Sequence, residues 1–64
     1  MTTSEHLRKI KAKCEELLRS PSYSQLTRAG WKSTIAAIEF LERTEMYSTT
    51  MACEIIYAWQ EELL

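Results

Sequence analysis

The first apolar stripe in the sequence lies within residues 5–19 and predicts an amphipathic helix. At 100° per residue its apolar positions fall within an arc of about 100°, and every Lys, Arg and Glu of the segment lies outside that arc; the positions are Leu7, Ile10, Cys14, Leu17 and Leu18. Thr2 and Glu5 have the spacing of a capping box, with Thr3 and Ser4 as alternative caps. Pro21 ends the helix, because a residue before proline is disfavoured in the helical region.

A second helix is predicted over Tyr23–Arg43. Ser22 and Gln25 have capping-box spacing, with Pro21 and Leu26 as the flanking hydrophobic staple. The charged strip of this helix is narrow, and two apolar flanks border it: one has Trp31, Ile35 and Ile38, the other Leu26, Ala29, Ala36 and Phe40. We therefore expect this helix to have neighbours on two sides.

Gly30 lies in the middle of that helix, where glycine costs about 1 kcal/mol relative to alanine. Two explanations are open. Close approach of another helix along Gly30, Thr34 and Ala37 would offset the cost, or the helix breaks between Arg28 and Trp31 and the chain has four helical pieces.

A third helix is predicted to follow Thr44–Tyr47 and to run to the end of the sequence. Three successive N-cap candidates precede it, Ser48, Thr49 and Thr50. Its main apolar face has Ala52, Ile55, Ile56, Trp59 and Leu63, whereas Cys53, Tyr57 and Leu64 lie on another side. Alternating patterns and Val are absent, so the predicted fold class is all-α: a three-helix bundle, or a helical hairpin with a third helix, packing as a homo-oligomer.

The 64 residues, of which 45% are hydrophobic, fit one domain spanning 1–64. A chain this short buries only about 60% of the surface of its unfolded form, so another subunit would add needed stability.

Charge is distributed unevenly along the chain. Residues 1–32 have seven basic and three acidic residues, a net charge of +4, whereas residues 33–64 have one basic and six acidic residues, a net charge of −5. An uneven charge distribution of this kind orients molecules as they associate. The longest apolar run has five residues, Ile55–Trp59, and no secretory signal is recognisable, so we expect no membrane span and a cytoplasmic location.

Catalytic and metal-binding residue types are scarce. The sequence has no Asp, no Asn and one His, which rules out Ser-His-Asp triads, paired aspartates and two-histidine zinc motifs. We therefore expect neither an enzyme nor a cofactor or metal. His6 is expected to be solvated. Cys14 and Cys53 are interpreted as reduced, at least partly buried thiols, with a disulfide between them as the minor alternative.

The basic residues of the first helix suggest a nucleic-acid surface as an alternative function. They are spread around the helix and interrupted by Glu5, Glu15 and Glu16; they are Arg8, Lys9, Lys11 and Lys13. A DNA-binding protein of this size is normally clearly basic, whereas this chain has a pI near 5.8. A solvated helix face is the preferred interpretation, and a dimeric nucleic-acid-associated regulator is the alternative.

Aromatic residues favour a protein-interaction function, because Trp and Tyr commonly anchor protein interfaces. We expect Trp31 and Trp59 in the core. The predicted contact surface comprises Phe40, Met46, Cys53, Tyr57 and Leu64. The preferred function is a small, non-enzymatic regulatory module that binds another protein and itself, with a dimer favoured. Accessory proteins of phages and other mobile elements are often this small, a comparison that rests on size alone.

Overall fold

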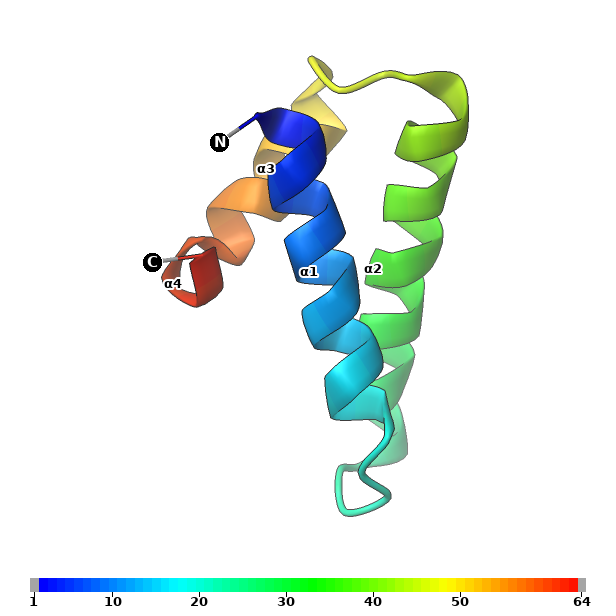
Figure 1. Cartoon of the computed structure of the whole chain (residues 1–64). Coiled ribbons are helices and arrows are strands. Elements are labelled where there is room, and N and C mark those ends of the chain that lie inside the picture. Colours follow the sequence, from blue (N-terminus) through cyan, green and yellow to red (C-terminus); the bar gives the residue numbers. More distant parts are fainter. Residues whose placement is uncertain (1, 64) are drawn as a thin grey trace.

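The computed structural model describes residues 2–63 and, over that range, contains helices and no strand. The elements are α1 (Thr3–Leu18), α2 (Gln25–Thr44), α3 (Thr50–Ala58) and the short α4 (Gln60–Leu63). α1 and α2 form an antiparallel hairpin, and α3 and α4 lie against α1 on the side away from most of α2 (Figure 1). The all-α class and the three main helices are thus confirmed.

Side-chain caps define where the helices begin. The Thr2 hydroxyl accepts a hydrogen bond from the Glu5 amide at 3.3 Å, so the first of the alternative caps is used. Likewise, the Thr49 hydroxyl accepts from the Ala52 amide at 3.3 Å and begins α3. Each bond satisfies a backbone donor that the first turn of a helix leaves without a partner.

The predicted start of α2 is wrong by two residues. Ser24, and not Ser22, is the N-cap, and its hydroxyl accepts from the Thr27 amide at 3.2 Å. The Ser22 hydroxyl is instead 2.7 Å from the hydroxyl of Ser20, within the loop. The staple is also wrong, because Leu26 is 85% exposed and covers nothing.

The loop between α1 and α2 is held by contacts from the first turns of α2. The guanidinium of Arg28 donates to the carbonyl of Ser20, just past the end of α1. Tyr23, which the sequence placed in the helix, lies in the loop with its ring edge-on to Trp31 at a centroid distance of 4.8 Å. The turn that Pro21 imposes is therefore tied to α2 by one hydrogen bond and one aromatic pair.

The explanation of Gly30 by a helix break is wrong, and the close approach of another helix is not found within the described residues. α2 runs without interruption through Gly30, so the helix does not break there. A Cβ placed at Gly30 would meet no described atom within 4 Å, so no other helix approaches it closely. The helical cost of this glycine, about 1 kcal/mol, therefore has no compensation within residues 2–63.

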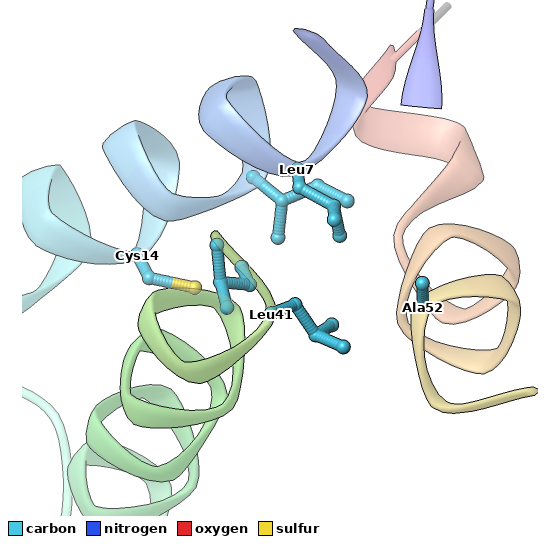
Figure 2. Close-up of a cluster of buried hydrophobic side chains, with 6 residues drawn as sticks. Leu7, Cys14, Leu41 and Ala52 are labelled. Atoms are coloured by element: carbon cyan, nitrogen blue, oxygen red, sulfur yellow. The ribbon is translucent and has the colours of Figure 1, made fainter. Parts of the chain in front are cut away.

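The core is one small cluster shared by three helices. Its fully buried side chains are Leu7, Ile10 and Cys14 from α1, Ile38 and Leu41 from α2, and Ala52 from α3. Figure 2 shows the α1 and α2 members turned toward each other, with Ala52 facing them from α3. Trp31 and Trp59 are partly buried against this cluster, as predicted. α1 is the central element, because it contacts α2, α3 and α4, whereas α2 and α3 share few contacts.

The third helix is interrupted at Trp59, where the sequence predicted a continuous one. Trp59 has φ −108° and ψ 14°, outside the helical range, and the chain turns there into α4. The turn lets Trp59 pack on the core and brings α4 against α1. Among the described helices, none combines the length and the apolar character that a membrane crossing requires.

Candidate interaction surface

Large apolar side chains remain exposed on several parts of the molecule. Leu26 on α2 is 85% exposed and Tyr57 on α3 is 75% exposed; Tyr23, Phe40, Met46 and Met51 are each exposed by 41–46%. Isolated exposed apolar residues are ordinary, but a group of them on one helix face is typical of an interaction site. The position of each on its helix therefore decides which of them belong together.

The outward side of α2 is apolar along most of its length. It lies opposite the core-facing residue Ile38, and all its members are exposed. We call this surface the α2 outer stripe; it consists of Leu26, Ala29, Ser33, Ala36 and Phe40. The guanidinium carbon of Arg43 lies 5.7 Å from the centroid of the Phe40 ring, and 41% of the Phe40 side chain stays exposed.

The outward side of α3 carries a second, smaller group. Cys53 and Tyr57 are one turn apart and both are exposed, opposite the buried Ala52. Met51 is exposed on the same helix, and Met46 is exposed in the loop that joins α2 to α3. We call the side of α3 formed by Cys53 and Tyr57 the α3 outer face; Met51 and Met46 are not part of it.

The predicted contact residues thus fall on more than one surface. Cys53 and Tyr57 share the α3 outer face, Phe40 belongs to the α2 outer stripe, and Met46 lies in the connecting loop. Leu64 lies outside the described residues. Leu26 was missed because the staple pattern assigned it to a covered position, although its spacing of seven residues from Ser33 and fourteen from Phe40 already placed it on their helix face.

The four basic residues of the alternative nucleic-acid surface do not form one patch either. The ammonium of Lys11 lies 3.7 Å from a carboxylate oxygen of Glu39 and 3.5 Å from one of Glu42, so its charge is directed onto α2. Arg8 and Lys9 are exposed and line a shallow hollow on α1 together with Glu5 and Ala12. Lys13 is half-buried. The nucleic-acid interpretation remains a prediction.

The two cysteines occupy different environments and are not joined. Cys14 is fully buried, as predicted, whereas Cys53 is exposed, so the predicted partial burial is wrong for Cys53. Burial raises the pKa of the Cys14 thiol, and the neighbouring Glu15 carboxylate raises it further. Cys14 therefore stays protonated as a core side chain, and Cys53 is the accessible thiol.

Possible metal ligands are not gathered in the structure. Among the residues described, no three His, Cys, Asp or Glu side chains are placed to share an ion. His6 is half-buried on α1, so it is less solvated than predicted. No family model, curated protein or solved structure matches the chain, so its surfaces are the basis for assigning a function.

Proposed function

We propose that the chain is a small, non-enzymatic, cytoplasmic regulatory module that acts by binding a protein partner and a second copy of itself. The observation that supports this most is the α2 outer stripe and the α3 outer face, where Leu26 and Tyr57 are 85% and 75% exposed. A chain of 64 residues has few large apolar side chains to form its core. Exposing Leu26 and Tyr57, instead of burying them in the core, favours a role in contacts between molecules.

The α3 outer face is the proposed site for a different protein. Tyr57 is 75% exposed on this face, and Tyr is a frequent interface anchor because its rigid ring buries a large area at a small entropic cost. Burying a large apolar side chain contributes about 1.5–3 kcal/mol, so losing the Tyr57 contact should weaken binding by about 10- to 150-fold.

Charge is proposed to set the orientation of the partner. Glu54 and Glu61 are exposed on α3 and α4, whereas Arg8 and Lys9 are exposed on the outer side of α1. A partner with basic residues around an apolar pocket would therefore be directed toward the α3 outer face. Such steering acts mainly on the association rate and decreases as salt screens it.

Capture from the lysate of the cells that make the protein tests this function. Tagged wild type is compared with Tyr57→Ser and with the matched control Ala58→Ser, which changes an exposed neighbour on the same helix. We expect a protein that is enriched by wild type and by Ala58→Ser and lost with Tyr57→Ser, while thermal unfolding of the three forms is unchanged. Equal enrichment by all three would exclude the α3 outer face, and joint loss of binding and folding would return Tyr57 to a structural role.

A further inference from the structure

We propose that the chain forms a swapped dimer in which α2 and α3 of each copy join into one straight helix and α3 packs on α1 of the second copy. This inference rests on the proposed function, because it specifies how the second copy binds. Exchange of an identical element between copies is a low-cost route to a dimer, since it reuses the contacts of the monomer. The core of either half is then incomplete without Ala52 of the other copy, a residue fully buried in the core cluster.

The connection between α2 and α3 has no residue that forbids a helix. It consists of residues 45–49, which include neither proline nor glycine. Among residues 2–63, Glu45 alone of the non-glycine residues has a positive φ, at 56°, and the left-handed conformation is unfavourable for a residue with a Cβ. A helical connection relieves that cost in both copies and gives the amides of the connection the partners of a continuous helix.

The core-facing sides of α2 and α3 are in phase across this connection. Trp31, Ile38, Ala52 and Trp59 are separated by multiples of seven residues, and all four are buried in the core or packed against it. Seven residues make nearly two turns, so in one continuous helix these four side chains fall within an arc of about 80°. Straightening the connection therefore gives α2 and α3 a single shared core-facing side.

The directions of the helices fit such a dimer. α1 is antiparallel to α2, and Figure 1 shows α3 beginning at the same end of the hairpin as α1 and running in the same general direction. Continued straight from α2, α3 therefore extends beyond the N-terminal end of its own α1. A two-fold axis at the connection places the second α1 there, running away from the first, in the direction that α3 needs. Each α1 then contacts its own α2 and the α3 of the other copy.

Tyr47 is the residue of the connection that favours the monomer. It is partly buried and packs against the core. In a continuous helix its position is about 160° from the middle of the shared core-facing side, so this contact is lost. Tyr47 packing thus opposes the dimer and the backbone conformation of Glu45 promotes it. The equilibrium depends on this short connection and shifts toward the dimer as protein concentration increases.

Sedimentation of chains unfolded and then refolded at high and at low concentration tests the role of the connection. Glu45→Gly relieves the left-handed conformation in the monomer and weakens the continuous helix in both copies, so it should weaken dimerisation at least about 100-fold. Tyr47→Ala removes a contact made only in the monomer and should strengthen dimerisation at least about 10-fold. Glu16→Gly on the exposed side of α1 and Tyr23→Ala in the other loop are the matched controls, which should leave the dimer dissociation constant unchanged.

Methyl NMR of isotope-labelled and unlabelled chains, mixed and refolded together, distinguishes the swapped dimer from two folded monomers side by side. We expect short-range contacts between the Ala52 methyl group of one copy and the core methyl groups of α1 in the other. A dimer whose α1–α3 contacts all stay within one chain overturns the proposal. A wild-type chain that is monomeric at every concentration also overturns it, and so do changes at Glu45 and Tyr47 that leave dimerisation as in wild type.

These results are separable from the proposed function. α3 packs on α1 through the same side in both forms, so the α3 outer face stays exposed in each. A strictly monomeric chain that still captures a protein through Tyr57 would remove the swap and leave the module. A swapped dimer that captures no protein would keep the swap and remove the proposed role in partner binding.

Discussion

Glu45 ends α2 in the left-handed conformation, at φ 56° and ψ 32°, and Glu45→Gly is expected to stabilise the fold. The left-handed conformation costs an L-residue about 1–2 kcal/mol. A carboxylate at the C-terminal end of a helix also opposes the helix dipole by about 0.3–1 kcal/mol at low salt. Glycine removes both costs. Its unfolded chain has more conformational freedom, however, and this reduces the gain by about 0.5–1 kcal/mol.

The net gain from Glu45→Gly is therefore about 1 kcal/mol. The amide of Met46 donates to the carbonyl of Leu41 at 3.1 Å, a bond that holds the left-handed turn in place and that glycine leaves unchanged. For a domain of this size, 1 kcal/mol corresponds to an increase of about 4–8 °C in melting temperature. The total stability of 64 residues is about 3–10 kcal/mol, so the change is readily measurable.

Thermal and urea unfolding of four forms separate the two contributions. Glu45→Gln removes the charge and keeps the backbone cost, so it should gain only the smaller, salt-dependent part. Glu45→Asn removes the charge and tolerates the left-handed conformation better than Gln, so it should lie between Gln and Gly. A Gly variant no more stable than the Gln variant would refute the argument, because no backbone cost would then be relieved.

Five further outcomes follow from the core, the charges, the thiols and the basic residues of α1. Leu7→Ala removes a fully buried side chain and should cost about 2–5 kcal/mol in unfolding free energy, measured by urea titration; a loss below 1 kcal/mol would mean that the cluster collapses around the cavity. Lys11→Met removes two partly exposed ion pairs with α2 and should change stability by less than about 1 kcal/mol, with a smaller effect at high salt. A thiol reagent should label Cys53 at once and Cys14 only on unfolding; equal rates would contradict the burial. Because burial raises the pKa of Cys14 in the folded chain, its contribution to stability should be full below the unfolded thiol pKa of about 8.5 and be lost as pH rises above it, a slope absent in Cys14→Ala. A DNA band retarded at low salt and released at moderate salt would favour the nucleic-acid alternative; we expect none.

Local signals predicted the helices well where a single feature dominates. Pro21 and the apolar stripe fixed α1 to within a residue at its C-terminal end, and Thr49 was among the predicted caps of α3. Ser22 and Ser24 both precede a helical pattern, and the choice between them depends on the hydroxyl contact of Ser22 with Ser20 in the folded loop. That contact has no counterpart in sequence spacing.

The candidate surface was harder to predict because periodicity describes a helix face without saying what covers it. The flank containing Leu26 and Phe40 was recognised and a neighbour was expected beside it, but periodicity could not say whether that neighbour belongs to the same chain; the described part of the structure leaves both side chains exposed. Conversely, Lys11 was read as a solvated basic residue and is paired with α2 carboxylates. A small bundle has few helices to cover its core, and this small number leaves some apolar helix faces exposed.

The central position of α1 has a consequence for synthesis. α1 precedes every helix that it contacts, so its apolar side leaves the ribosome before any of its partners. At about 5–20 residues per second, the α2 segment follows within a few seconds and α3 shortly afterwards. During that interval the nascent chain presents Leu7, Ile10 and Cys14 to chaperones, and the hairpin with α2 is the first arrangement able to withdraw them.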